Sequence, residues 1–256
     1  LSPARYQMQF GQNLLYLGES AQAIEQFTNL SNILSYSSIP DVFYHRAAAL
    51  TESGNLIDAE KIWQQVASDS SNLKRQYYAQ KMLTILKAEV NNWKEYDDTT
   101  RFGILYYKRP DIPIQKEIAS TIQNPDLKVK AYAYTINTLL EANKTQEADD
   151  FLQKLDKNVQ VTLSAQSELN KAYLALCYKK QDFSTLASII EKIPLIARHE
   201  HHRFFYKAIL TESKDIKQSE SLYAKALQGN PFDLLFYPDF IRFYNEKKKN
   251  KEAGYN

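Results

Sequence analysis

The chain has 256 residues, of which 44% are hydrophobic and 24% are charged, with a formal net charge of +2. It contains 6 glycines and 8 prolines, fewer than folds of strands and turns use, so the composition favours helices joined by short turns. A near-neutral charge, with the basic residues spread along the chain, argues against a nucleic-acid-binding protein.

A helix-pair phrase occurs twice in residues 1–72. The first copy consists of Gly11, Leu14, Gly18, Ala23 and Phe27, and the second, 36 residues later, of Ala47, Leu50, Gly54, Ala59 and Trp63. We expect two regular helix pairs here, with helices at 3–17, 20–32, 40–53 and 56–67. Gly18 and Gly54 should end the first helix of each pair.

Residues 73–128 are less regular. Helical spacing covers 73–90 and, in weaker form, 93–107. Pro110 and Pro113 must interrupt any helix, and a short helix at 113–122 should follow them. We therefore predict a degenerate helix pair plus an extra helix in this segment.

Regular spacing returns in residues 129–256. Helix pairs are expected at 129–142 with 145–155, at 166–179 with 183–193, and at 203–213 with 216–227, before a last helix at 234–247. Ala148, Leu186, Ser219 and Ala253 then occupy equivalent places, with spacings of 38, 33 and 34 residues. We predict three pairs and the first helix of a further, truncated repeat, with Ala253 at the start of its second helix.

This phrase resembles that of the tetratricopeptide-repeat family. The family places a small and a large apolar residue in the first helix, Gly or Asn at the turn, Ala and an aromatic residue in the second helix, and Pro after it. Later matches are Tyr132, Leu139, Asn143, Ala148 and Leu152, then Leu210, Tyr223, Ala226 and Asn230-Pro231. The resemblance covers about three quarters of the chain, with 73–125 outside it, and implies an all-α, right-handed superhelical solenoid of antiparallel helix pairs.

The resemblance also implies a concave surface, lined by the first helix of each pair, that holds a peptide or a partner helix. The groove residues expected on this basis are Arg5, Met8, Gln12, Tyr44, Ala48, Lys130, Asn137, Lys171, Tyr178, Phe204, Ala208 and Arg242. Some family members clamp a C-terminal carboxylate with lysines and asparagines, but here the matching places hold residues such as Met8, Gln12 and His45. We expect a non-enzymatic scaffold that binds a protein segment and assembles a complex.

The most catalytic-looking cluster is His199-Glu200-His201-His202. A zinc-protease helix needs a second histidine four residues after the first, and Arg203 occupies that place. His199 and His202 could share a helix face and hold a metal ion. Solvated or half-packed histidines at a helix start account for the same residues, so we predict no metal, no cofactor and no catalytic residue.

The only cysteine, Cys177, lies in an apolar run and should be a small buried side chain, which rules out an intramolecular disulfide. No apolar stretch reaches the roughly 18 residues of a membrane helix, so no membrane insertion is expected. The chain begins at Leu1 rather than Met, and we expect it to be a piece of a longer protein. A removed leader would favour the bacterial cell envelope over the cytoplasm.

Two other functions fit the same sequence. The chain could be a regulatory or sensor segment that controls an attached output domain of a multidomain protein. It could also be a metal-dependent enzyme that uses the cluster from His199 to His202.

Overall fold

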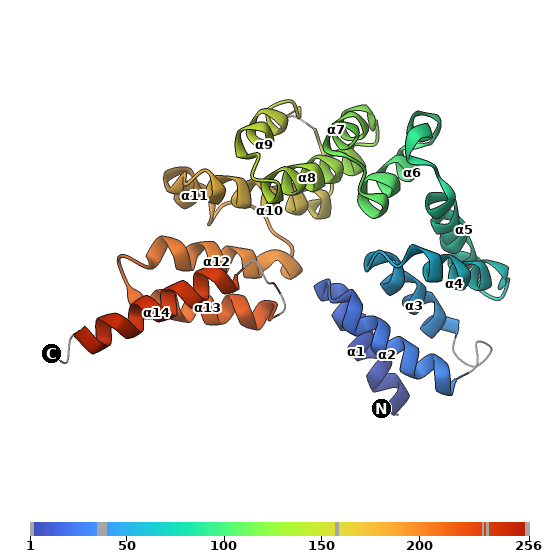
Figure 1. Ribbon diagram of the computed structural model, residues 1–256, viewed down its shortest axis with the longest axis horizontal. Helices are drawn as coiled ribbons and strands as arrows, with labels where there is room; N and C mark the ends of the chain where they lie inside the picture. Colours follow the sequence, from blue (N-terminus) through green and yellow to red (C-terminus); the bar gives the residue numbers. More distant parts are fainter. Residues whose placement is uncertain (1–2, 35–39, 157–158, 232, 234–235, 254–256) are drawn as a thin grey trace. The chain divides into compact units, whose positions relative to one another are not determined.

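The part of the chain that the structure describes consists of helices joined by turns and loops. The computed structural model describes residues 3–34, 40–156, 159–231, 233 and 236–253, and these contain no strand. The chain divides into two compact units, Leu1–Leu127 and Lys128–Asn256. Within each unit, helices that follow one another along the chain pack against each other (Figure 1).

The first unit begins with the two regular helix pairs expected from the sequence. Its helices are α1 (Pro3–Leu17), α2 (Ser20–Ile33), α3 (Pro40–Glu52), α4 (Leu56–Ser68), α5 (Leu73–Lys87), α6 (Asp98–Gly103) and α7 (Ile112–Thr121), with a 3₁₀ helix at Val90–Glu95 and a π-helical turn at Ile104–Lys108. The single helix expected at 93–107 is wrong. The Asp97 side chain accepts a hydrogen bond from the Thr100 backbone N–H at 2.8 Å and so starts a new helix within that segment.

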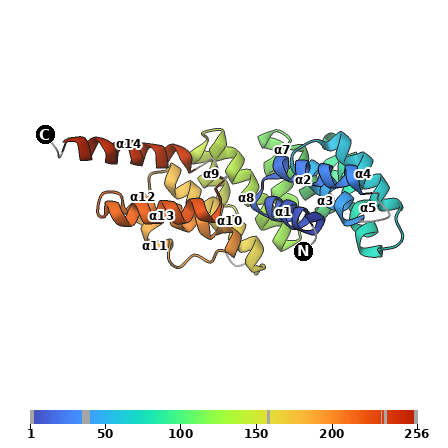
Figure 2. The same cartoon turned by 90° about the horizontal axis from the view of Figure 1, so that it is seen from below.

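The second unit also contains the expected helices, with different ends. They are α8 (Pro125–Glu141), in whose first turn the unit boundary falls, α9 (Thr145–Leu152), α10 (Leu163–Lys179), α11 (Phe183–Ile189), α12 (Glu200–Thr211), α13 (Ile216–Gly229) and α14 (Tyr237–Ala253), with a 3₁₀ helix at Ala197–His199. Helices α12 and α13 lie side by side in both views (Figure 1, Figure 2). Ala253 is the last residue of α14, so the prediction that it begins another helix is wrong. The helix continues to this residue because neither Gly nor Pro occurs at 247–253 to break it.

Four turns between paired helices share one backbone geometry. The left-handed residue is Gly18 (φ 90°), Gly54 (φ 82°), Asn143 (φ 57°) or Gln181 (φ 57°). The backbone N–H of the residue after it bonds the carbonyl five positions back, as in Glu19 to Leu14, Asn55 to Leu50, Lys144 to Leu139 and Asp182 to Cys177 at 2.8–2.9 Å. This is the Schellman arrangement that closes a helix C-terminus, and here it recurs from pair to pair.

The core repeats with the same phase as the turns. Near the start of the second helix of each pair lies a residue with an exposed fraction of 0%: Ala23, Ala59, Ala148, Leu186 and Ser219. Four of these residues are followed, four positions later, by a large buried residue: Phe27, Trp63, Ile190 or Tyr223. In α9 the large residue is Phe151, three positions after Ala148, and its ring stacks on Tyr132 at a centroid distance of 4.4 Å. Small residues let the paired helices approach, and the large ones fill the space beside them.

The left-handed turn residue gives a stability prediction. Gly54 has φ 82° and no atom within 4 Å of an added Cβ, so Gly54→Ala should lower the free energy of unfolding by about 1 kcal/mol through backbone strain alone. Both tryptophans, Trp63 and Trp93, lie in the first unit, so denaturant unfolding followed by tryptophan fluorescence measures this unit. Asn143→Gly in the second unit relieves the same strain and should not lower stability; its unfolding is followed by circular dichroism, because that unit contains no tryptophan. A Gly54→Ala protein as stable as the wild type would contradict the argument.

One arginine closes the end of α11. The Arg203 guanidinium, from α12, donates to the Ile193 carbonyl at 2.7 Å and to the Ile190 carbonyl, and Glu200 holds it at 2.9 Å. These carbonyls follow α11, which ends at Ile189 instead of near the expected residue 193. The last carbonyls of one helix pair are thus satisfied by a side chain of the next pair.

Within the described residues, none of the helices combines the length and the apolar character that crossing a bilayer requires.

Candidate functional site

The expected groove residues of the first unit lie on α1 and α3. Arg5 is exposed, whereas Met8, Gln12 and Tyr44 are half-buried. Gln12 donates from Nε2 to Nε2 of His45 at 2.9 Å, which joins the first helices of two successive pairs. Burial lowers the pKa of His45 despite the opposing charge of Asp41, in agreement with a neutral ring that accepts this bond.

Tyr44 belongs to an aromatic cluster at the next helix junction. Its ring meets Trp63 edge-on at a centroid distance of 5.4 Å and Tyr78 of α5 at 5.5 Å. Burial, followed by the nearby Tyr78, raises the pKa of Tyr44 to about 12. The hydroxyl therefore stays protonated at neutral pH, and the residue offers an aromatic edge and one neutral hydroxyl.

Lys130, Asn137 and Lys171 lie on the first helices α8 and α10 and are all half-buried. Lys171 is ion-paired with Glu168, with Nζ and Oε2 3.2 Å apart. Burial alone would raise the pKa of Glu168, but the charges of Lys171 and Arg198 help to outweigh it and lower the pKa. Lys171 is thus part of a local charge cluster on α10.

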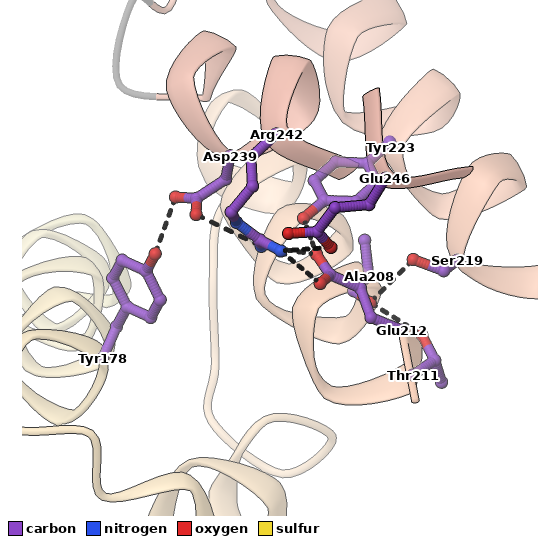
Figure 3. Close-up of polar contacts among 9 residues, drawn as sticks. All are labelled: Tyr178, Ala208, Thr211, Glu212, Ser219, Tyr223, Asp239, Arg242 and Glu246. Carbon is purple, nitrogen blue, oxygen red and sulfur yellow. Dashed lines mark hydrogen bonds and ion pairs between the residues drawn. The ribbon is translucent and has the colours of Figure 1, made fainter. Parts of the chain in front are cut away.

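Tyr178 and Arg242 are joined through acidic residues of the second unit (Figure 3). The Tyr178 hydroxyl donates to Asp239 Oδ2 at 2.7 Å, which connects α10 to α14. Two nitrogens of Arg242 each lie 2.9 Å from an oxygen of Glu212, at the end of α12, in a bidentate pair. The Tyr223 hydroxyl of α13 also donates to Glu212. One carboxylate therefore connects three helices.

The tyrosines of this network are held in their neutral form. Burial is the main cause that raises the pKa of Tyr178 and of Tyr223, and the hydrogen bond to Asp239 or Glu212 raises each further. The hydrogen bonds to Glu212 raise the pKa of Arg242. Glu212 and Asp239 are acceptors that sequence reasoning missed, since their partners lie 30 and 61 residues away.

The remaining expected aromatic residue, Phe204, is half-buried on α12, with the Lys225 ammonium 5.9 Å from its ring centroid. Ala48 is half-buried, whereas Ala208 has an exposed fraction of 0% and is a core residue, which makes its expected place in the groove wrong. The structure therefore brings expected residues together in two places, Gln12 with Tyr44 through His45, and Tyr178 with Arg242 through Asp239.

The three histidines of the His199–His202 cluster are buried, not solvated. His199, His201 and His202 have exposed fractions of 5%, 6% and 7%. His199 is bound elsewhere than expected: its Nδ1 lies 2.7 Å from Ser167 Oγ and its Nε2 3.5 Å from Glu168 Oε1. Burial, more than the neighbouring cations, lowers the pKa of His199 to about 4, so the ring is neutral at pH 7.

His201 and His202 face a different partner. Their Nε2 atoms lie 3.4 and 3.7 Å from Oδ2 of Asp233, which sits in the segment between α13 and α14. His202 was expected to pair with His199, but these two rings are 6.3 Å apart, whereas the His201 and His202 rings are 4.3 Å apart. No spacing signal in the sequence connects Asp233 to histidines more than 30 residues before it.

Cys177 is buried, as expected, with an exposed fraction of 3%. Burial raises the pKa of its thiol to about 11, which keeps it protonated and unreactive at neutral pH.

Comparison of the chain with protein-family models, with curated proteins and with solved structures gave no match. The class of protein that the helices themselves define is an all-α chain of sequentially packed helices with a recurring turn.

Proposed function

We propose that the chain is a tetratricopeptide-like scaffold without catalytic activity, whose first helices bind a peptide or a helix of a partner protein. The observation that carries the proposal is that most of the expected groove residues are half-buried on the first helices of the pairs. The exceptions are Arg5 and Arg242, which are exposed, and Ala208, which is buried. A half-buried side chain is held by its own fold and still offers surface to a partner. The right-handed superhelix stays a prediction of the family resemblance.

Order in the free protein favours such binding. Gln12, Tyr44 and Tyr178 are fixed by hydrogen bonds or ring contacts to neighbouring helices, so their rotamers are largely set before a partner arrives. Side chains that are already ordered lose little entropy on binding. In the second unit, Tyr178 and Phe204 would act as aromatic anchors, with Lys130 and Asn137 at the polar rim; in the first unit, Tyr44 would act as an anchor.

A charge change on the first helix α8 tests the proposal. The double variant Lys130→Glu with Asn137→Glu changes two half-buried positions of this helix. It leaves Tyr44 unchanged, because replacing Tyr44 would disturb its contact with the buried Trp63. Peptides selected from a displayed library against the wild-type chain should bind this double variant at least about tenfold more weakly in fluorescence anisotropy.

The matched control is Lys217→Glu with Gln218→Glu, the same charge change at exposed positions of the second helix α13. It should bind the selected peptides as the wild type does. Equal binding by both double variants would show that the α8 face is not the site. A library that yields no peptide ligand for the wild-type chain would count against the scaffold itself.

The regulatory or sensor segment remains an alternative prediction of the sequence. It differs from the scaffold in requiring an attached output domain whose activity changes when a ligand binds the helices.

A further inference from the structure

The cluster of His201, His202 and Asp233 has the composition of a transition-metal site. Two imidazoles from the first turn of α12 and one carboxylate from the segment between α13 and α14 each offer one ligand atom, and these atoms all lie within 4.8 Å of one another. Both histidines are buried, and the Asp233 side chain is 13% exposed. Imidazole nitrogen with one carboxylate oxygen suits zinc and its neighbours better than calcium or magnesium, which prefer oxygen ligands.

The separations of the ligand atoms leave room for an ion between them. The Nε2 atoms of His201 and His202 are 3.4 and 3.7 Å from Asp233 Oδ2, longer than the usual 2.7–3.2 Å of an N–H···O hydrogen bond. Zn²⁺ binds nitrogen and carboxylate oxygen at about 2.0–2.2 Å, so ligand atoms at the corners of a tetrahedron stand roughly 3.3–3.5 Å apart. The two histidine–aspartate distances are close to the edges of such a tetrahedron, and all three ligand atoms lie within 4.8 Å of one another.

The surrounding residues hold the three side chains in place. A Cβ added to Gly229, at the end of α13, would stand 2.7 Å from the His201 Cβ, so glycine lets α13 approach α12 at this point. Phe236 is buried and meets the rings of His201 and His202 edge-on, at 5.5 and 5.2 Å. The Asp233 N–H bonds the Asn230 carbonyl at 3.4 Å and the Phe236 N–H bonds the Asp233 carbonyl at 3.2 Å, so both backbone groups of Asp233 have partners.

We propose that His201, His202 and Asp233 bind one Zn²⁺ or a similar divalent transition ion, with water in the fourth position. The ion ties the segment between α13 and α14 to the start of α12. This site differs from the His199–His202 pair considered from the sequence, because His199 is bound to Ser167 and Glu168. It is independent of the scaffold proposal, because none of its ligands is an expected groove residue.

The test is metal binding by the purified full chain after treatment with a chelator. Zn²⁺ titrated against a chromophoric competitor should bind with one equivalent per chain, and Co²⁺ should give the intense visible absorption of a four-coordinate site. Zn²⁺ should also raise the midpoint of thermal unfolding measured by circular dichroism. A wild-type chain that takes up no equivalent of either ion would overturn the proposal.

Variants assign the ligands. Asp233→Asn, nearly identical in shape, and His201→Gln should each lower the affinity for Zn²⁺ at least about tenfold. The control His199→Gln removes the third buried histidine and should keep one equivalent. Circular dichroism of the metal-free proteins shows whether each variant is folded. Unchanged affinity in a folded Asp233→Asn protein, or loss of binding in a folded His199→Gln protein, would place the ion elsewhere and reject this site.

Discussion

Replacing Trp63 with alanine should lower the free energy of unfolding of the first unit by about 3–5 kcal/mol. Trp63 has an exposed fraction of 0% and contacts the rings of Tyr44 and Tyr78. Its Nε1 donates at 2.9 Å to Thr51 Oγ1, which itself donates to the Ala47 carbonyl. Alanine would leave a cavity between three helices and remove the donor to a buried hydroxyl.

Denaturant unfolding followed by the fluorescence of the remaining Trp93 measures this effect, since Trp93 lies in the same unit. The control is Tyr77→Ala, an aromatic residue of α5 that is 61% exposed, which should change stability by no more than about 0.5 kcal/mol. Trp63→Phe keeps most of the ring volume but not the N–H, so its loss of stability should lie between those of Trp63→Ala and Tyr77→Ala. Similar losses for Trp63→Ala and Tyr77→Ala would contradict the assignment of Trp63 to the core.

The second large effect is expected for Glu212→Ala. This change removes the acceptor of the Tyr223 hydroxyl and both bonds to Arg242 at once (Figure 3). Tyr223 is buried with an exposed fraction of 0%, so its hydroxyl would lose a charged acceptor, which costs about 2–3 kcal/mol. Arg242 is 41% exposed and can turn to water, so its part in the loss is small.

Circular dichroism of the full chain measures this change, because both tryptophans lie in the first unit and their fluorescence should stay constant while the second unit loses helix. Glu246→Ala is the matched control: Glu246 also contacts Arg242, at 3.4 Å, but it is 60% exposed and should be nearly neutral. Tyr223→Phe should lower the free energy of unfolding by only about 1 kcal/mol, because it removes the hydroxyl itself and so leaves no buried donor without an acceptor on this residue. A Glu212→Ala protein no less stable than Glu246→Ala would contradict the network.

The sequence predicts the helices best where local chemistry alone decides them. Gly18 and Gly54 mark turns that the backbone confirms, with φ values of 90° and 82°. Gln181 takes the same left-handed conformation with φ 57°, although glutamine gives no local signal for it. Its side chain is exposed, and local backbone bonds close the turn, from the Gln181 N–H to the Tyr178 carbonyl and from the Asp182 N–H to the Cys177 carbonyl. Backbone groups of any residue type can form these bonds, so the residue type at 181 does not reveal the turn. Likewise, the helix expected at 93–107 failed because Asp97 caps a new helix inside a stretch of helical spacing.

Partners distant in sequence account for what could not be predicted of the sites. Arg242 and Tyr178 could be assigned to first helices from spacing, but their acceptors Glu212 and Asp239 lie on other elements. The histidines form a visible run in the sequence, but the burial of His201 and His202 depends on Gly229 and Phe236, which lie about 30 residues further along the chain. Asp233 joins them only through the fold.

The bonds of Arg203 bear on how this chain can be divided. Because a residue of α12 satisfies the carbonyls of Ile190 and Ile193, a fragment that stops before Glu200 would leave the preceding helices with a frayed end. Stability in this region then belongs to adjoining pairs jointly, as in a linear chain of coupled neighbours. A deletion, graft or swap that includes α10 and α11 should therefore cut after α13 and not between α11 and α12, so that the piece keeps the arginine that closes the end of α11.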